Sequence, residues 1–522
     1  MSIKVAVIGA GSVGFTRGLM NDMLGVPELQ DSEFCFTDLS QRNLDLVMRL
    51  VKRDVAHNRL PAKVWGTTSR RRALDGADFV YNVTRIGGLA AFKTDIDIPL
   101  KYGVDQCVGD TLCIGGIMYG QRNAAAVLDF CKDIRQVAKP DALLLNYANP
   151  NAMNTWVANK YGGVRTIGLC HGVQGGHWQI ATVIEFLVNE GRERGSAGYR
   201  EVPMKEVEIT AAGINHQTWF IKVLYRGEDW TGRLLDGFER HPVYRNNEKV
   251  RIDMLRRFGY YTTESNGHCS EYVAWYRKRP GEIRKWIAMD SWINGETGGY
   301  LRVCAEGRDW FEKGYPKWLA EPPREFGPQK RGQEHGSYII ESLLTGRVYR
   351  GHFNVPNNGC ITNLPDDAIV EVPCFVDKSG IAVPQIGDLP LGCAAVCNAS
   401  ISVQRLAVEA AVHADVTLLK QSALMDPLTG AACNPNEISQ MVDEMLIAQA
   451  KWLPQFRKEI APARARMRRE KRLGTRKGRG AARKRTRSVS ELKRQGDAAR
   501  RASVAADKAA KKREVQARRR RV

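Results

Sequence analysis

The sequence predicts an α/β protein: a doubly wound, mostly parallel sheet, followed by a second α+β region and a basic tail. Three observations predict this class. Short apolar runs alternate with helical patterns from the N-terminus to about residue 195, and after Pro203 strand-like and helical patterns are mixed. After Ala461 large apolar side chains almost disappear. We therefore expect three parts, which are residues 1–195, 196–460 and 461–522.

Five runs in the first part are apolar throughout instead of alternating between apolar and polar residues. They occupy residues 5–8, 34–36, 79–83, 142–145 and 166–169. Continuous apolar runs are typical of parallel strands that helices cover on both faces, so we expect a doubly wound sheet. In the second part, residues 207–212 are strand-like and residues 403–419 follow a helical period. We expect this part to be a second α+β domain packed against the first.

A glycine-rich loop follows the first expected strand and opens a helix. Gly9 permits a tight turn, Gly11 lets the backbone approach a pyrophosphate, and Gly14 lets helix and strand pack. The amides around Ser12, at the helix N-terminus, are unpaired donors for phosphate. Asp38 comes 24 residues after Gly14, close to the spacing of the acid that binds a ribose hydroxyl. The pattern predicts a Rossmann-type dinucleotide site that favours NAD, although an arginine four residues after Asp38 leaves NADP open.

One sulfur and one nitrogen that can bind a metal are expected to meet at the edge of this sheet. Cys170 and His171 follow the last parallel strand and precede a helix, so they lie at the carboxyl edge, where ligands bind. A helix N-terminus lowers the pKa of a thiol, and we expect Cys170 to be a thiolate able to bind a metal. His216 ends another expected strand and can approach the same point, which leaves positions open for substrate. The alternatives are a packing role for Cys170 and a hydrogen-bonded core role for His216; thiolate alone would favour zinc.

The positive charge of the chain is concentrated in the tail. The formal net charge is +21, and residues 461–522 hold 25 Lys or Arg against 5 Asp or Glu. With so few apolar side chains, this tail is expected to be disordered or at most partly helical. It is either an arm that binds RNA or anchors the protein, or a dispensable extension, and the lack of interleaved aromatic residues favours the second.

The N-terminus runs directly into a strand, which suggests no signal peptide. No apolar run approaches the roughly 18 residues that span a bilayer, so no membrane association is expected. We therefore expect a cytoplasmic protein in which most of the twelve cysteines are small buried apolar groups.

Seven motifs occur in order and together resemble the NAD- and manganese-dependent glycosidases, glycoside hydrolase family 4. They are Gly9 to Gly14, Gly109-Asp110-Thr111, Asn146 to Met153, Gly168 to His171, Gly213 to His216, Thr263 to His268, and Asn357-Asn358-Gly359. The resemblance covers about residues 1–456 and leaves only the tail outside. Relatives are usually dimers or tetramers, so a homo-oligomer is implied.

The resemblance implies cleavage of a glycoside by temporary oxidation, an exception to the two-carboxylate rule for glycosidases. NAD takes hydride from C3, and the resulting ketone acidifies the proton at C2. A base removes that proton, and the leaving group departs from C1 with help from an acid. Water then adds and the hydride returns to C3.

Residue roles follow from the positions that match the family's motifs. Cys170 and His216 correspond to the manganese ligands, which hold the oxygens at C2 and C3 of the sugar. His171 corresponds to the acid that protonates the leaving group. Tyr272 is our choice for the base at C2, with Asp110 assisting its ionisation, because a free tyrosine titrates near pH 10. A purely structural role in the aromatic core is the alternative for Tyr272.

The same resemblance addresses the substrate. Asn149 corresponds to a ligand of a sugar hydroxyl, and Lys93 stands near the place where many relatives use an arginine for substrate. His171 directly after the metal cysteine resembles members that act on unphosphorylated α-galactosides and α-glucosides, and an α-galactosidase is expected. Gly172 replaces the serine common in those α-galactosidases and resembles relatives that take α-linked uronic acids. An α-glucosidase, an α-glucuronidase or an α-galacturonidase therefore stays open.

Two other classes compete with this interpretation. An NAD-dependent hydroxy-acid dehydrogenase would share the first domain, but it needs an Arg-His-Asp set and has no use for a thiolate metal pair. A nucleic-acid-binding protein would depend on the tail. Deleting residues 461–522 separates this class, since the glycosidase hypothesis predicts unchanged turnover.

Overall fold

A single mixed sheet of 13 strands runs through the computed structural model, which describes residues 2–190, 192–288, 295–476, 480–496 and 498. Six parallel strands lie in the order β3-β2-β1-β4-β5-β6, and β11, β12, β7, β8 and β10 continue from β6 in antiparallel pairing. The strands are β1 Lys4–Ile8, β2 Glu33–Thr37, β3 Lys63–Thr67, β4 Phe79–Asn82, β5 Leu143–Asn146, β6 Thr166–Leu169, β7 Val207–Ile214, β8 Gln217–Tyr225, β9 Glu228–Asp229, β10 Tyr261–Thr262, β11 Tyr349–Pro356, β12 Ile369–Asp377 and β13 Gly380–Ala382.

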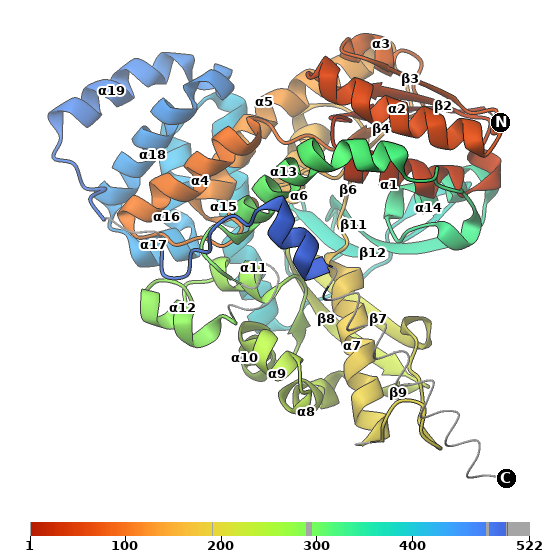
Figure 1. The fold of residues 1–522 in the computed structure, drawn as a ribbon. Helices are drawn as coiled ribbons and strands as arrows, with labels where there is room; N and C mark the ends of the chain where they lie inside the picture. The colour runs from red at the N-terminus through yellow and green to blue at the C-terminus, as the bar shows by residue number, and fades with distance from the viewer. Residues whose placement is uncertain (1, 191, 289–294, 477–479, 497, 499–522) are drawn as a thin grey trace.

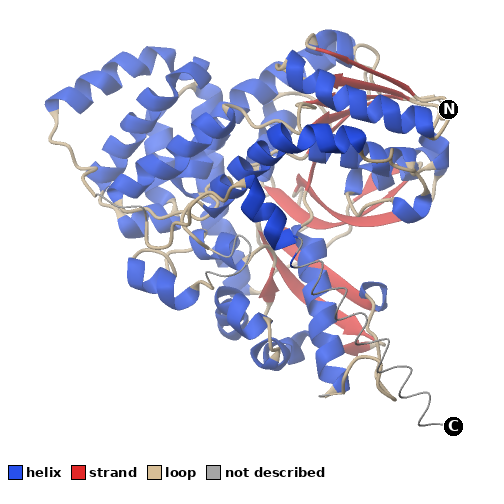
Figure 2. Cartoon of the chain, viewed as in Figure 1, coloured by secondary structure: helices blue, strands red, loops and turns tan. Residues whose placement is uncertain are grey.

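Helices cover both faces of the parallel strands, and a group of C-terminal helices packs beside them (Figures 1 and 2). The doubly wound sheet predicted from the apolar runs is confirmed. The helices are α1 Val13–Leu24, α2 Gln41–His57, α3 Arg70–Leu74, α4 Gly88–Tyr102, α5 Cys113–Val137, α6 Asn151–Trp156, α7 Gly172–Asn189, α8 Leu234–Arg240, α9 Tyr244–Asn247, α10 Lys249–Phe258, α11 Asn266–Glu271, α12 Pro280–Trp286, α13 Gly299–Ala320, α14 His335–Thr345, α15 Leu391–His413, α16 Val416–Met425, α17 Pro427–Ala432, α18 Pro435–Gln449 and α19 Ile460–Arg469.

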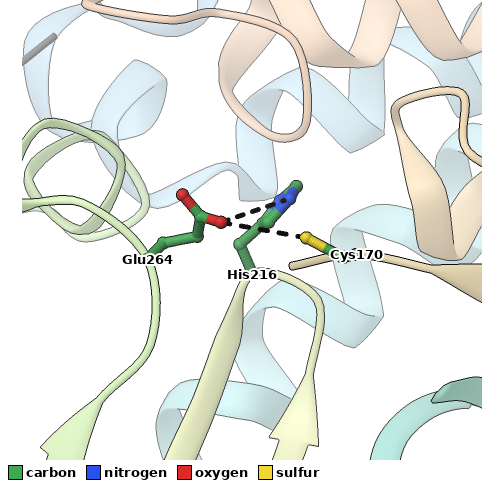
Figure 3. A group of neighbouring side chains, drawn as sticks. All are labelled: Cys170, His216 and Glu264. Atoms are coloured by element: carbon green, nitrogen blue, oxygen red, sulfur yellow. Dashed lines mark hydrogen bonds and ion pairs between the residues drawn. The ribbon is translucent and has the colours of Figure 1, made fainter. Parts of the chain in front are cut away.

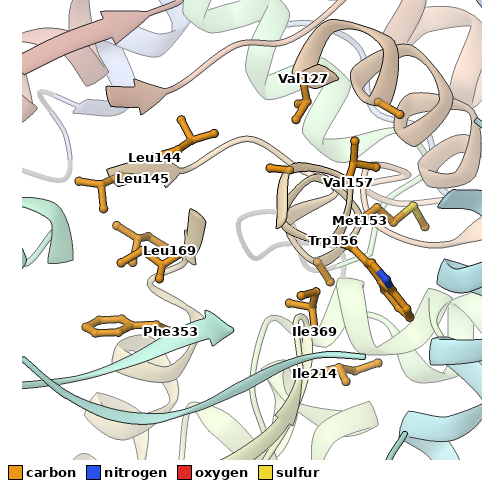
Figure 4. Close-up of a cluster of buried hydrophobic side chains, with 14 of the residues drawn as sticks. Val127, Leu144, Leu145, Met153, Trp156, Val157, Leu169, Ile214, Phe353 and Ile369 are labelled. Carbon is orange, nitrogen blue, oxygen red and sulfur yellow. The ribbon is translucent and has the colours of Figure 1, made fainter. Parts of the chain in front are cut away.

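The second half of the chain extends the sheet of the first half. Phe353 of β11 pairs with Leu169 of β6, and Glu371 of β12 pairs with Gly213 of β7. The core is shared accordingly: Figure 4 shows Leu169 and Phe353 in one apolar cluster with Ile214 of β7. Burying one such side chain contributes about 1.5–3 kcal/mol. The strand β7 is thereby held close to the carboxyl edge of the parallel strands.

The helical pattern over residues 403–419 belongs to two helices and not one. The first, α15, ends where Ala414 adopts a left-handed φ of 57°. Asp415 then caps α16, since its side chain accepts from the amides of Thr417 and Leu418. Apolar periodicity continues through the break, so it carries no sign of the turn.

Among the described residues, α15 is the one helix long and apolar enough to cross a membrane by length and composition, with a hydropathy of 1.3. Half of that stretch is buried, and it packs against α5 and α16.

The described part of the basic tail contacts the body of the protein more extensively than its composition predicts. Helix α19 opens it, and Arg466 forms two hydrogen bonds with Asp443. Further on, Arg487 binds the carboxylate of Glu306. These arginines meet buried carboxylates, which composition alone does not reveal. Residues 499–522 lie outside the described residues.

Candidate active site

The polar side chains of the site come from segments that end at one edge of the sheet. Arg85, Asn149 and Cys170 follow β4, β5 and β6, at the carboxyl ends of parallel strands. His216 lies in the turn between β7 and β8. Glu264 lies between β10 and α11. The predicted meeting of Cys170 with His216 therefore depends on the antiparallel extension of the sheet.

Three side chains form a group that could hold a metal ion (Figure 3). One ligand atom each of Cys170, His216 and Glu264 lie within 4.8 Å of one another. Oε1 of Glu264 is 3.8 Å from Sγ of Cys170 and 3.9 Å from Nε2 of His216. Glu264 has a left-handed φ of 70°, a strained conformation of the kind that clusters at functional sites. Sequence reasoning gave Glu264 no role, although its motif was part of the family resemblance.

Hydrogen bonds fix which ring nitrogen of His216 faces the group. The hydroxyl of Thr111 donates to Asp110 Oδ1 at 3.0 Å, because a carboxylate only accepts. The same hydroxyl therefore accepts from Nδ1 of His216 at 3.1 Å. Nε2 keeps its lone pair and faces Glu264. Burial lowers the pKa of His216 to about 4, so the ring is neutral, as a metal ligand must be.

The thiol of Cys170 differs from expectation. Burial, then the nearby Glu264 and Glu371, raise the pKa of Cys170 above its usual range. The amide of Gly172, in the first turn of α7, does donate to Sγ at 3.4 Å and acts in the predicted direction. Burial outweighs it, so the helix N-terminus alone does not make a thiolate here. A bound cation would supply the missing charge, since metal binding displaces a thiol proton.

A buried imidazole connects the metal-binding group to Asp110. Nδ1 of His268 lies 2.8 Å from Oε2 of Glu264, and Nε2 lies 3.7 Å from Oδ1 of Asp110. Burial by itself would lower the pKa of His268, but the two carboxylates outweigh it and raise this pKa to about 10. The pKa values of Glu264 and Asp110 are held below their usual range, although burial opposes this. His268 is thus a cation between two carboxylates.

Tyr272 lies against this pair of imidazoles. Its ring stacks on His268 at 5.5 Å and on His216 at 6.5 Å between centroids. It is 1% exposed, and its phenolic oxygen has no hydrogen-bond partner among the described residues. Burial raises the pKa of Tyr272 well above its usual value. The phenol is therefore neutral in the chain alone, and any role as a base needs added positive charge nearby.

Asp110 also contacts Asn149, which was predicted to bind substrate, and Arg85, which the sequence did not single out. Nδ2 of Asn149 donates to Oδ2 of Asp110 at 3.1 Å. Nη2 of Arg85 lies 3.5 Å from the same oxygen, and its guanidinium lies over Tyr119 and Tyr300 at 5.1 Å. Guanidinium stacking on aromatic faces holds such a cation in place.

Lys93 and His171 lie differently from the cluster. The side chain of Lys93 is 68% exposed and pairs with Asp97 one turn along α4, so its substrate contact stays a prediction. Arg85 is the arginine that lies beside Asp110. His171, next to Cys170, is 75% exposed and lies 3.8 Å from Glu334. An exposed imidazole there is open to a ligand and to water.

The dinucleotide loop makes the tight turn that was predicted at Gly9. Gly9 has a φ of 91°, and its amide donates to Thr37. A Cβ on Gly11 would lie 2.7 Å from Oδ2 of Asp38, whose carboxylate accepts from the Gly11 amide at 2.8 Å. The reason expected for Gly14 is wrong, because a Cβ there would meet nothing within 4 Å.

The positions around this loop fit a dinucleotide. Ser12 is the exposed N-cap of α1, and its side chain makes no capping hydrogen bond. The first amides of α1 are therefore left without a side-chain cap, as phosphate binding requires. Arg42, the residue that left NADP open, is bound by both carboxylate oxygens of Glu312 at 2.9 and 2.7 Å. Arg42 thus has a carboxylate partner of its own, and the preference for NAD depends on Asp38.

All twelve cysteines are free, and ten of them are buried, as expected for small apolar groups. Cys170 and Cys304 are partly exposed.

Comparisons with known proteins identify the family. The model of the family 4 glycosyl hydrolases matches residues 4–186, and the model of their C-terminal domain matches residues 211–429. An α-galactosidase of Rhizobium meliloti (strain 1021) is 54% identical over 499 residues, which are 95% of this chain and 98% of that protein. An α-galactosidase of Bacillus subtilis (strain 168) is 30% identical over 455 residues, 87% of this chain and 100% of that protein.

Solved structures share the fold. The Bacillus subtilis protein lplD has a TM-score of 0.72 at 25% identity, over 85% of this chain and 100% of that one. A 6-phospho-β-glucosidase of Thermotoga maritima, solved with manganese, NAD+ and glucose-6-phosphate, has a TM-score of 0.68 at 23% identity, over 86% of this chain and 99% of that one.

The Rhizobium meliloti match also bears on the tail. It takes in 95% of 522 residues and so leaves about 26 outside, fewer than residues 461–522 contain. Part of the basic segment is therefore shared with that relative. Matched by the models of both domains and by a 54% identical relative over nearly its whole length, the chain belongs to glycoside hydrolase family 4.

Proposed function

We propose that this glycosidase hydrolyses α-galactosides, with NAD and a manganese ion as its cofactors. One observation carries the proposal: a sulfur, an imidazole and a carboxylate meet within 4.8 Å on the same sheet edge that carries the dinucleotide loop. A simple hydroxy-acid dehydrogenase has no use for such a group. The 54% identity to an α-galactosidase supports galactose as the sugar.

The donor set suits manganese when a substrate completes the site. Cys170, His216 and Glu264 would hold the ion, and three protein ligands leave positions for sugar oxygens. The carboxylate adds a hard oxygen ligand to the thiolate and imidazole, which weakens the preference for zinc that thiolate alone implies. When bound, NAD supplies a hydride acceptor and donor for C3, and manganese supplies a Lewis acid for the oxygens at C2 and C3.

Tyr272 is proposed to take the proton from C2. Its unpartnered phenolic oxygen supports this role, because a buried hydroxyl without a hydrogen bond is costly unless a ligand uses it. Ionisation needs positive charge, and the cation of His268 stacks on the Tyr272 ring at 5.5 Å. Asp110 holds His268 and Asn149 and thereby assists indirectly. His171, exposed beside Cys170, is proposed to protonate the leaving group.

Asn149 and Arg85 are proposed to bind sugar hydroxyls next to Asp110. The partly buried guanidinium of Arg85 is equally suited to the carboxylate of a uronic acid, and an α-galacturonidase of Bacillus subtilis is 28% identical. We also propose that the protein is cytoplasmic, which the free thiols support, and that it forms a homo-oligomer, as relatives in the family usually do.

A panel of nitrophenyl glycosides tests the proposal. The α-galactoside, α-glucoside, α-glucuronide and α-galacturonide are supplied in turn with NAD, manganese and reductant, and nitrophenol release is measured. We expect fastest release from the α-galactoside, loss with a chelator, and recovery on adding manganese. Cys170→Ser should abolish turnover, whereas Cys304→Ser, at the other partly exposed cysteine, should retain it. Nitrophenol release that needs neither NAD nor metal would refute the mechanism. Faster release from a uronide than from the α-galactoside would make a uronide the substrate instead of a galactoside.

A further inference from the structure

The basic segment after the α18 region binds carboxylates and carbonyl groups of the body along much of its length. We call residues 460–476 and 480–496 of this segment the C-terminal strap. In Figure 1 the strap passes from α19 across the front of the molecule to a short helix near α13. Its first portion is fixed by Arg466 on the buried carboxylate of Asp443, at 2.7 and 2.8 Å. The amide of Arg476 donates to the carbonyl of Lys101 at the end of α4.

The second portion of the strap binds the start of a loop that leads into the active site. The amide of Ala481 donates to Oδ2 of Asp105 at 2.8 Å, and the amide of Ala482 donates to the hydroxyl of Thr297 at 3.3 Å. Asp105 is buried, and its Oδ1 accepts from Arg277 at 2.9 Å and from Thr297 at 2.7 Å. The strap therefore supplies a ligand to a buried carboxylate, and removing one partner of such a group is costly.

A second contact joins the strap to α13. Arg487 binds Glu306 through its backbone amide at 2.8 Å and through Nη2 at 2.7 Å. The side chain of Glu306 is 5% exposed. Helix α13 also carries Tyr300, on which Arg85 lies, and Arg85 pairs with Asp110.

The loop that begins at Asp105 ends in the site. The amides of Cys107, Val108 and Gly109 all donate to the carboxylate of Glu271, at 2.7, 3.1 and 3.0 Å. Glu271 directly precedes Tyr272 in the chain. The next two loop residues are Asp110 and Thr111, which orient His268 and His216.

We propose that the C-terminal strap is a positioning element of the active site: it fixes loop 105–111, which orients the metal-binding histidine and the proposed base. The catalytic part of this inference rests on the proposed function, whereas the ordering of the loop does not. It replaces the expectation that deleting residues 461–522 leaves turnover unchanged. The alignment of a 54% identical α-galactosidase into this segment fits a shared role.

Two truncations test the strap. A chain that stops after residue 479 lacks the contacts to Asp105, Thr297 and Glu306, and a chain that stops after residue 498 keeps them. Hydrogen exchange of the peptide covering residues 105–111 is measured by mass spectrometry, since amides on buried carboxylates exchange only when the loop opens. We expect at least tenfold faster exchange in the shorter chain and no change in the longer one. Manganese binding, followed by loss of the free-ion electron paramagnetic resonance signal, should weaken at least tenfold in the shorter chain alone.

Point variants decide the matter if the shorter chain does not fold. Ala481→Pro removes the amide hydrogen that binds Asp105, and Ala481→Gly keeps it. Arg487→Gln removes the guanidinium contacts to Glu306 and keeps the backbone one, whereas Arg485→Gln affects only the pair with Glu491 inside the strap. Faster loop exchange in the first member of each pair alone supports the inference. Unchanged exchange of loop 105–111 in all four variants, or equally fast exchange in the two control variants, overturns it. A different result is that the full-length protein neither binds manganese nor cleaves glycosides, while Ala481→Pro and Arg487→Gln still speed exchange of loop 105–111. That result would support the role of the strap and refute the proposed function.

Discussion

At the scale of single residues, the lack of a side chain at Gly172 leaves the space that the carboxylate of Glu264 occupies. Gly172 opens α7, directly after the pair Cys170 and His171. A Cβ at Gly172 would lie 2.6 Å from Oε1 of Glu264, the oxygen that faces Cys170 and His216. The absence of a serine at this position therefore has a structural reason that does not depend on the sugar.

Gly172→Ala is expected to displace the Glu264 carboxylate and weaken manganese binding. Disturbing a residue that orients or forms a metal site typically costs about 10–100-fold in affinity. Gly175→Ala is the matched control in the same helix, because a Cβ there meets nothing within 4 Å. Manganese titration of both variants makes the comparison. Equal affinities would mean that Glu264 is not a ligand.

Tyr272→Phe separates a catalytic tyrosine from a core aromatic. The lost hydroxyl has no hydrogen-bond partner among the described residues, so we expect the melting temperature to stay close to that of the parent. Turnover should fall by about 10²–10⁴-fold, the usual contribution of a positioned base. Tyr276→Phe is the control, since its hydroxyl binds Asp253 at 2.9 Å and its loss should lower stability more than turnover. A variant at Tyr272 that keeps full turnover would exclude it as the base.

The sequence identified part of this site. Cys170 and His216 were predicted because strand ends and helix starts carry recognisable patterns, and the fold brings them together. Glu264 and Arg85 could not be assigned, because their roles depend on how loops from distant segments meet. Lys93 was chosen by its place along the chain, yet it lies on an exposed part of α4.

At the scale of elements, the dinucleotide loop tests the glycine argument. Gly11→Ala would place a Cβ 2.7 Å from Asp38, and overpacking of this kind costs about 1–3 kcal/mol. NAD affinity, measured by titration, should therefore fall about tenfold or more. Gly18→Ala, in the interior of α1 with nothing within 4 Å of its Cβ, should leave NAD affinity unchanged and stabilise the protein slightly. Unchanged NAD binding in the first variant would place the dinucleotide elsewhere.

Elements were predicted where one pattern decides them. The continuous apolar runs of β1, β2, β4, β5 and β6 gave the parallel strands directly. The break between α15 and α16 was missed, because Ala414 adopts a left-handed conformation and alanine is not a residue type that predicts one. The contacts of the tail with the body were missed for a related reason. A run of arginines predicts solvent-exposed charge, and the sequence does not show that Arg466 and Arg487 bind buried carboxylates.

At the scale of the whole molecule, one sheet joins the two expected domains. Because β11 pairs with both β6 and β12, and β12 with β7, the turn that holds His216 lies beside the strand end that holds Cys170. The sequence predicted both halves but not this continuity, since strand pairing between distant segments leaves no local pattern. The metal-binding group therefore exists only in the complete fold.

The central claim is that the sugar is oxidised for part of the reaction without net redox change. Turnover of nitrophenyl α-galactoside carrying deuterium at C2, at C3 or at C1 tests it most directly, with NAD and manganese present. We predict primary isotope effects at C2 or C3 and only a small secondary effect at C1. A small secondary effect at C1 with none at C2 or C3, in an enzyme that turns over without NAD, would contradict the account.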